Sequence, residues 1–347
     1  MKVVVTGGAG FLGYHIGTKI NEITNFNESV FFDIAPFPEG DYHKDISRIY
    51  GDVRDQKQMD EILNGADVVI HCAAALPLWK KNDILETNVG GMKNVCDSCL
   101  RLGVGRLIFI SSTSVYGVPK EHPLFETNPR IGVGTYGKSK IQAEEICEDY
   151  RKKGLNVCIL RPKSFIGTAR LGVFQILYDW VESGAKIPII GNGKNRYQLF
   201  EVDDLVDAIN LCATLPVEKV NDVFNVGAKD FKTVNEDVGA MCDYAKTGSR
   251  VMRTPAWMIK PVLRFFEILN LSPLYKWIYG TADTDSFVSI EKAQKTLGWN
   301  PKYSNADALI RSYQWYLDNK HTIQKGTGVT HRIAWKQGIL GLFKKLL

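Results

Sequence analysis

The first thirteen residues restrict the fold of this chain more than any later segment. Residues 2–6 form a short, mostly apolar run, and the next seven are Gly-Gly-Ala-Gly-Phe-Leu-Gly, ahead of a helical pattern over 14–23. A buried strand, a glycine turn and a helix in this order are typical of the first unit of a dinucleotide-binding sheet. Small residues allow a tight turn and let a pyrophosphate approach backbone N–H groups at the helix N-terminus. The residues that this turn offers to a dinucleotide are Gly7, Gly10, Phe11, Leu12 and Gly13.

Strands and helical stretches alternate along the first two thirds of the chain. Runs that read as strands cover 30–33, 67–71, 106–110, 156–160 and 224–226, and helical patterns cover 55–64, 84–102 and 136–153. This spacing predicts parallel βαβ units with right-handed connections. The predicted fold class is α/β, a doubly wound parallel Rossmann sheet with a smaller C-terminal substrate lobe. Ligands of such sheets bind at the carboxyl ends of the strands.

An acidic residue ends the second predicted strand, twenty residues beyond Gly13. Asp33 at this position can accept hydrogen bonds from both hydroxyls of an adenosine ribose and would repel a 2′-phosphate, so it favours NAD over NADP as the cofactor. Asp52 and Val53 follow in a Gly-Asp-Val sequence, where an aspartate commonly meets the adenine edge. We therefore predict that Asp33, Asp52 and Val53 contact NAD.

A tyrosine and a lysine four residues apart provide a candidate catalytic pair. Tyr136 and Lys140 lie on one face of the helix predicted over 136–153. A free tyrosine has a pKa of about 10 and is a poor base at neutral pH, but a neighbouring ammonium group and the positive nicotinamide ring favour its phenolate. The hydroxyl-rich run 111–114 follows the strand 106–110, at the rim where ligands bind, and a hydroxyl there can orient the reacting oxygen of a substrate.

Over roughly residues 1–317 these features resemble the NAD-dependent epimerase/dehydratase family, the extended short-chain dehydrogenases/reductases. The residues that carry the resemblance are Gly7-x-x-Gly10-x-x-Gly13, Asp33, Gly51-Asp52-Val53, His71-Cys72-Ala73-Ala74, Asn88, Ser111 to Gly117, Tyr136-x-x-x-Lys140, Arg161-Pro162, Lys292-Ala293 and Leu297-Gly298-Trp299-x-Pro301. The resemblance implies hydride transfer between a carbinol carbon and the nicotinamide, with Tyr136 moving the hydroxyl proton.

The same resemblance implies roles for further residues. Counting back from Val-Tyr-Gly at 115–117 places the catalytic hydroxyl on Ser112, which joins Tyr136 and Lys140. Cofactor contacts are implied for Ala73, Asn88 and Pro162 besides Tyr136 and Lys140, and a substrate contact for Thr113. Dimers are implied through the helices near 84–102 and 136–153.

The chain divides into three parts on this reading. Residues 1–165 form the NAD-binding Rossmann core, which is completed by about 197–228. The segments 166–196 and 229–317 form the substrate lobe, since the pattern after Pro162 is less regular. A basic amphipathic tail covers 318–347.

Three positions depart from the patterns that the resemblance implies. Sugar dehydratases of the family carry Asp-Glu directly after the catalytic threonine, whereas this chain has Thr113-Ser114, so elimination of water is not expected. Nucleotide-sugar epimerases place an asparagine where Ser164 stands, and an arginine, which binds phosphate, where Tyr197 stands one residue after Arg196. Ser164, Arg196 and Tyr197 are therefore predicted to bind the substrate, together with Thr113.

The leading hypothesis is an NAD-dependent epimerase or dehydrogenase that acts at a carbinol carbon, C4, of a sugar linked to a nucleotide or a lipid diphosphate. The Arg-Pro-Lys run at 161–163 and the apolar stretch 255–280 also resemble the 3β-hydroxysteroid and sterol dehydrogenase branch. A hydroxysteroid-type or other lipid-alcohol dehydrogenase is therefore the alternative. A catalytically idle NAD-binding scaffold is the third class.

Charge and cysteine content exclude other classes. The formal net charge of +5 comes from residues 318–347, which contain six Lys or Arg and one Asp, while the rest of the chain is balanced. A neutral body is not that of a nucleic-acid-binding protein. The seven cysteines are scattered, apart from Cys96-x-x-Cys99 in a helical stretch, and we predict reduced thiols, no metal site and a cytoplasmic protein without a secretory signal.

The end of the chain has the pattern of a surface-bound helix. Wound as a helix, 332–347 places an apolar face opposite its lysines and contains no acid. The face consists of Trp335, Ile339, Leu342, Phe343 and Leu346. Such a helix is typical of peripheral membrane contact, here at the inner face of the membrane through 331–347, with 257–279 beside it. The alternative is that both segments pack on the body or on a dimer partner.

Overall fold

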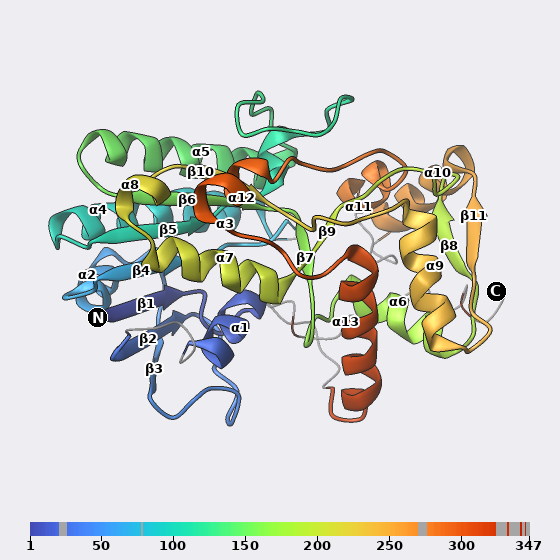
Figure 1. The fold of residues 1–347 in the computed structure, drawn as a ribbon, viewed down its shortest axis with the longest axis horizontal. Coiled ribbons are helices and arrows are strands. Elements are labelled where there is room, and N and C mark those ends of the chain that lie inside the picture. The colour runs from blue at the N-terminus through green and yellow to red at the C-terminus, as the bar shows by residue number, and fades with distance from the viewer. Residues whose placement is uncertain are drawn as a thin grey trace.

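The computed structural model describes residues 1–20, 26–77, 79–269 and 276–323, together with Arg332, Gly341 and Lys344. Its centre is a sheet of seven parallel strands in the order β10-β6-β5-β4-β1-β2-β3 (Figure 1). The strands are β1 (Lys2–Thr6), β2 (Glu28–Asp33), β3 (Ile46–Tyr50), β4 (Val68–His71), β5 (Arg106–Ile110), β6 (Val157–Pro162) and β10 (Val223–Val226). The order reverses beside β1, which is where a doubly wound sheet binds its ligand. The predicted fold class is confirmed.

Helices cover both faces of the sheet, so the strands are apolar on both sides. Along β1, Val3 and Val5 face a core shared with α1 (Phe11–Lys19) and α7 (Val202–Thr214), while Val4 faces the opposite core. The opposite core is built with α2 (Gln56–Leu63), α4 (Gly91–Arg101) and α5 (Gly134–Lys152). Burial on both faces explains the unbroken apolar runs in the sequence. The helices α4 and α5 lie side by side on the outside of their layer (Figure 1).

The predicted helix over 84–102 is interrupted. It consists of α3 (Lys81–Leu85), a π-helical turn η1 (Glu86–Gly90) and α4. The side chain of Asn88 in η1 accepts a hydrogen bond from Ala75 N at 2.8 Å and donates one to Ser139 Oγ at 3.0 Å. These contacts tie the turn to the loop after β4 and to α5. A π-helical turn of this kind is often found at a functional site.

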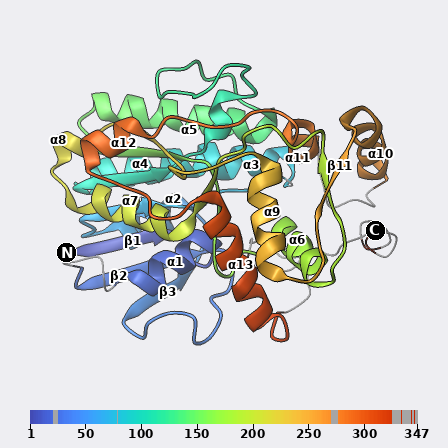
Figure 2. The same cartoon turned by 45° about the vertical axis from the view of Figure 1, so that its right-hand side comes forward.

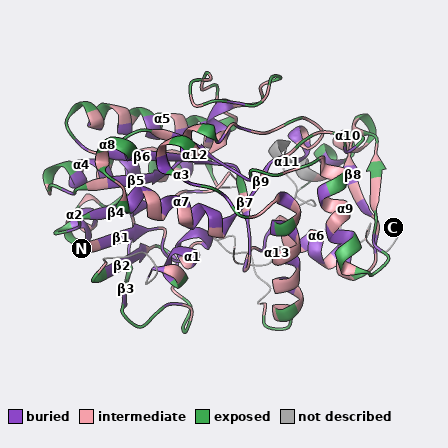
Figure 3. Ribbon diagram, in the orientation of Figure 1, coloured by how far each residue is buried: buried purple, intermediate pink, exposed green. Residues whose placement is uncertain are grey.

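A second lobe stands beyond the carboxyl ends of the strands (Figure 1 and Figure 2). Its elements are β7 (Ser164–Ile166), α6 (Val173–Glu182), β8 (Ile187–Ile190), β9 (Leu199–Glu201), α9 (Val234–Ala245), β11 (Val251–Thr254), α10 (Ala256–Ile268), α11 (Lys276–Thr281) and α13 (Asn305–Asn319). Its own core contains Tyr178, Met241 and Tyr313 from three of these helices. Two further helices, α8 (Val217–Val220) and α12 (Glu291–Leu297), pack beside the sheet at β10. Figure 3 shows buried residues concentrated in the strands and along the inner sides of the helices.

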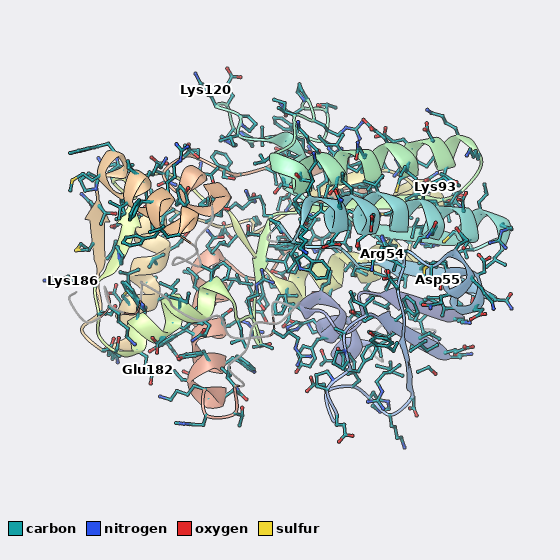
Figure 4. The ribbon with its side chains drawn as sticks, turned by 180° about the vertical axis from the view of Figure 1, so that it is seen from behind. Arg54, Asp55, Lys93, Lys120, Glu182 and Lys186 are labelled. Carbon is teal, nitrogen blue, oxygen red and sulfur yellow. The ribbon has the colours of Figure 1, made fainter. Side chains whose placement is uncertain are left out.

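The outer surface of the core is held by short-range polar contacts. Arg54 donates to the carboxylate of Asp52 from Nε at 2.8 Å and from Nη2 at 2.6 Å, and Asp55 caps α2. Figure 4 shows Arg54 and Asp55 near Lys93 of α4, on the opposite side of the molecule from Glu182 and Lys186 of the second lobe. Cys96 and Cys99 are buried free thiols on α4, as helix packing requires.

Most of the predicted tail helix over 331–347 lies outside the described residues. Within 331–347, Arg332 and Lys344 are described and contact the body. Arg332 Nη2 donates to Asp41 Oδ2 at 2.5 Å, and Lys344 Nζ donates to Asp179 Oδ2 at 2.5 Å. Among the residues that the structure describes, no helix is long and apolar enough to span a bilayer.

Candidate active site

A cavity of about 820 Å³ extends from the glycine turn to the second lobe. Most of the residues predicted to act on a cofactor or substrate line it, although they come from distant parts of the sequence. They are Gly7, Gly10, Phe11, Leu12, Asp33, Asp52, Val53, Ala73, Ser112, Thr113, Tyr136, Lys140, Pro162, Ser164 and Tyr197. Gly13, Asn88 and Arg196 do not line it.

The glycine turn is held close to the neighbouring strands. Gly7 adopts a φ of +73°, and its N–H donates to the carbonyl of Phe32 at 2.8 Å. A Cβ on Gly7 would lie 2.6 Å from Ala73 N, and a Cβ on Gly13 would lie 2.4 Å from Gly7 O. Gly13 therefore packs α1 against the turn, while Gly10 caps the helix N-terminus where it meets the cavity. This bare backbone at a helix N-terminus fits a pyrophosphate.

Asp33 ends β2 beside this turn. Its carboxylate accepts hydrogen bonds from Ala9 N at 2.9 Å and Ala35 N at 2.8 Å, so its position is fixed before any ligand arrives. Burial raises the pKa of this carboxyl above its ordinary value, and the backbone N–H groups of Ala35 and Ala9 oppose the rise. A fixed acid one strand away from the glycine turn fits the adenosine ribose of NAD.

Tyr136 and Lys140 occupy the first turns of α5 and face the same cavity. Lys140 Nζ lies 5.9 Å from the centre of the Tyr136 ring and donates to Ile110 O at 2.9 Å. Lys140 is buried, and burial lowers the pKa of its ammonium group to about 8. The geometry places a cation beside the phenol at the carboxyl end of β5, as the sequence pattern predicted.

The hydroxyl run after β5 divides into two functions. Ser112 Oγ accepts a hydrogen bond from Ser114 N at 3.1 Å, which caps the short 3-10 helix η2 (Thr113–Tyr116), and Ser112 and Thr113 line the cavity. Ser111 instead donates to Glu144 Oε1 at 2.6 Å. Glu144 belongs to α5, so this bond ties the loop that carries Ser112 to the helix that carries the tyrosine and lysine.

Asn88 acts behind the cavity wall. Its side chain bonds to both backbone groups of Ala75, at 2.8 Å from the N–H and 3.3 Å from the carbonyl, and to Ser139. The structure therefore places Asn88 where it shapes the loop between β4 and α3, which carries Ala73.

The predicted substrate residues separate into two groups. Ser164 Oγ and Tyr197 Oη lie 3.5 Å apart on the cavity wall. Arg196 is turned away from the cavity, and its guanidinium stands 4.7 Å from the ring centres of Phe231 and Phe287. Tyr197 forms an isolated β-bridge with Ser286, so the backbone is extended here and successive side chains point in opposite directions. Of Arg196 and Tyr197, only Tyr197 therefore reaches the cavity.

Three lysine or arginine residues line the cavity without having been predicted as site residues, and the first of them, Lys81, begins α3. Lys163 follows β6, and Arg170 stands 4.9 Å from the Phe11 ring centre. Lys163 belongs to the Arg-Pro-Lys run that suggested a sterol dehydrogenase, so the sequence contained a signal for it. Arg170 lies in an irregular segment whose sequence gives no signal.

The family model for the NAD dependent epimerase/dehydratase family matches residues 3–227. This match covers more than half of the chain, and the chain belongs to this family. It is an NAD-dependent enzyme of the extended short-chain dehydrogenase/reductase type, and the fit of the glycine turn and Asp33 to NAD agrees with that assignment.

Two curated relatives and one solved structure illustrate the similarity. The uncharacterised protein y4nG of Sinorhizobium fredii is 34% identical over 344 residues, which cover 98% of this chain and 84% of the relative. The N-acetyl-α-D-glucosaminyl-diphospho-ditrans,octacis-undecaprenol 4-epimerase of Escherichia coli O157:H7 is 32% identical over 219 residues, or 60% of this chain and 62% of that protein. A UDP-glucuronic acid 4-epimerase from Bacillus cereus, solved with NAD, has the same fold, with a TM-score of 0.74 at 21% identity, covering 92% of this chain and 99% of that chain.

Proposed function

We propose that this enzyme is a sugar epimerase that oxidises and re-reduces C4 of a sugar linked to a nucleotide or a lipid diphosphate. The observation that carries the proposal is a single cavity in which Ser112, Tyr136 and Lys140 stand between the glycine turn and the second lobe. We assign cofactor binding to residues 1–165 and about 197–228 of the chain, and sugar binding to residues 166–196 and 229–317.

Each catalytic residue has a role that follows from its position. Bound NAD supplies the acceptor and donor of hydride at the sugar carbon. Tyr136 accepts the hydroxyl proton and later returns it, while the Lys140 ammonium, 5.9 Å from the phenol ring, favours the phenolate. Ser112 hydrogen bonds to the reacting oxygen and orients it toward Tyr136.

Epimerisation is favoured over dehydration by the residues after Ser112. Thr113 and Ser114 carry hydroxyls, so neither supplies the carboxyl group that would protonate a leaving hydroxyl or remove a carbon-bound proton. The relative from Escherichia coli is a 4-epimerase by name, as is the solved Bacillus cereus protein. These names support inversion at C4 of a diphosphate-linked sugar here.

The test is a turnover assay without added NAD. UDP-linked, dTDP-linked and polyprenyl-diphosphate-linked sugars carrying deuterium at C4 are incubated with the purified enzyme, and products are identified by NMR. An epimerase should invert C4, keep the label and form no net NADH. In a parallel assay with excess added NAD, accumulation of NADH in proportion to substrate would establish a dehydrogenase instead. Oxidation of a 3β-hydroxysteroid in that parallel assay would establish the lipid-alcohol alternative.

We further propose that α10 binds an anionic membrane surface together with 331–347. Trp257, Met258, Val262 and Phe265 are exposed on this helix, Trp257 by 78%. Arg264 is exposed among them, and the tail adds a surplus of basic residues, of which Arg332 and Lys344 pair with acids of the body. An apolar face with aromatic residues flanked by cations fits the interface of an anionic bilayer, where a lipid-linked sugar would be met.

Vesicle flotation tests this surface. The double variant Trp257→Ser/Phe265→Ser is expected to reduce binding to phosphatidylglycerol vesicles at least tenfold, because each aromatic side chain contributes roughly 1.5–3 kcal/mol on burial. Deletion of 331–347 should weaken binding too. Tyr50→Ser removes an equally exposed aromatic residue from β3 and serves as the control. If both the double variant and the deletion float as well as the intact chain, α10 does not bind membranes.

A further inference from the structure

Lys163 is a buried cation in the wall of the active-site cavity. It stands between the end of β6 and the start of β7, and its N–H donates to Val226 O at 2.9 Å. Only 5% of its surface is exposed, yet it lines the cavity that contains Tyr136. Because β5 and β6 are paired in parallel, Lys163 follows β6 at the same edge of the sheet where Ser112 follows β5.

The contacts of Lys163 leave its charge without a counter-ion. Its Nζ donates to Ser286 Oγ at 2.6 Å and stands 5.0 Å from the centre of the Tyr197 ring. No carboxylate of the described residues forms an ion pair with it. An ammonium group has three donors, and burying one with a single neutral acceptor is costly. Burial accordingly lowers the pKa of Lys163 to about 7.

A neighbouring buried cation has a counter-ion, and two acids on the cavity wall have hydrogen-bond partners. Arg161, two residues earlier and equally buried, donates to Glu144 Oε2 at 2.6 Å. On the cavity wall, Asp285 accepts from Arg196 N at 2.8 Å, and Asp237 accepts from Asn305 Nδ2 at 2.9 Å. Both acids bond to neutral donors, and neither forms an ion pair with Lys163 among the described residues. Lys163 therefore differs from Arg161 in having no counter-ion.

The groups around Lys163 suit an oxygen anion. The hydroxyls of Ser164 and Tyr197 lie 3.5 Å apart, and Ser286 adds a third hydroxyl that already contacts the ammonium group. Hydroxyl donors around one cation offer several hydrogen bonds to a carboxylate or phosphate oxygen, and such charge-assisted bonds are stronger than neutral ones.

We propose that Lys163 binds an oxyanion carried by the substrate, either a carboxylate on the sugar or a phosphate of its diphosphate. The inference rests on the proposed function for the identity of the ligand, but it concerns binding and does not require turnover. The enzyme then prefers substrates whose negative group reaches the end of β6.

Calorimetry on the NAD-loaded protein separates the two sources of the oxyanion. UDP-glucuronic acid and UDP-glucose differ only by a carboxylate in place of a hydroxymethyl group, and both carry the diphosphate. If Lys163 binds the carboxylate, Lys163→Met should lower the affinity for UDP-glucuronic acid alone by about 10- to 100-fold. If it binds a phosphate, the affinity for both ligands should fall equally. Lys219→Met, an exposed lysine on α8, is the matched control. Unchanged affinity for both ligands in a folded Lys163→Met protein would overturn the proposal.

The pH dependence provides a second readout on the same proteins. The free lysine is protonated below pH 7 and loses its proton above it, so binding of the anion at higher pH requires uptake of a proton. Affinity should therefore fall by up to tenfold per pH unit above about 7 in the intact protein. It should fall less in Lys163→Met, where Lys140, with a pKa of about 8, is the remaining cation of this kind in the cavity. Identical pH profiles in the intact protein and in Lys163→Met contradict the assignment. Failure of every sugar to turn over would count against the proposed function and leave these binding results valid.

Discussion

The variant Tyr136→Phe is expected to reduce kcat by about 10²- to 10⁴-fold and to leave NAD affinity unchanged within about twofold. The change removes one oxygen, which is the atom that accepts and returns the hydroxyl proton. The ring remains beside Lys140, which is held by Ile110 O at 2.9 Å and keeps its place. The measurement is the rate of sugar turnover at saturating substrate, together with NAD binding by fluorescence titration.

A matched control makes the result specific. Tyr244→Phe removes the same atom from α9, where the hydroxyl donates to Gln314 Oε1 at 2.9 Å outside the cavity. That variant should keep the activity of the intact chain. If Tyr136→Phe retained more than a tenth of the activity, another group would have to be the base. Loss of NAD binding in the same variant would show that the ring, and not its proton chemistry, had been disturbed.

The parts of the fold that the sequence predicted correctly are those set by local pattern. Val3, Val4 and Val5 are all buried because helices cover both faces of β1, and an unbroken apolar run is the signature of such a strand. The glycine turn was also predicted from the sequence, because the close approach of Gly7 to Ala73 leaves no room for a side chain at position 7. Spacing alone placed Tyr136 and Lys140 on one helical face.

The features that the sequence did not predict depend on contacts between distant residues. The π-helical turn at Glu86–Gly90 is fixed by bonds from Asn88 to Ala75 and to Ser139, far along the chain. The side chain of Lys163 bonds to Ser286, which lies 123 residues later in the chain. Arg196 was predicted to bind substrate because it lies beside Tyr197 in the sequence. It stacks instead on Phe231 and Phe287, and no local sequence pattern indicates this tertiary contact.

A buried charge network supports the catalytic loop and should be the most sensitive part of the core. Glu144 is completely buried and accepts hydrogen bonds from Arg161 Nε at 2.9 Å, Arg130 Nη1 at 3.1 Å and Ser111 Oγ at 2.6 Å. Arg161 also donates to Tyr116 Oη at 2.8 Å. The carboxylate is therefore the counter-charge for a guanidinium that has almost no access to water.

Glu144→Gln should lower the free energy of unfolding by about 3–5 kcal/mol, because it leaves Arg161 buried without its counter-ion. Urea denaturation measures this as a shift of the midpoint at unchanged slope. Glu148→Gln, which contacts only the partly exposed Arg130 in this network, should cost no more than about 1 kcal/mol and serves as the control.

The double variant Glu144→Met/Arg161→Met decides whether the charges or the packing are responsible. Replacing both members of a buried pair by apolar groups removes the unpaired charge, so the double variant should be more stable than the sum of its single variants predicts, with a coupling of about 1–3 kcal/mol. Strict additivity would mean that the two side chains act independently as space-filling groups. Because Ser111 lies next to Ser112, the refolded double variant should still lose activity: its hydroxyl bond to Glu144, which holds the catalytic loop against α5, would be gone even where stability is recovered.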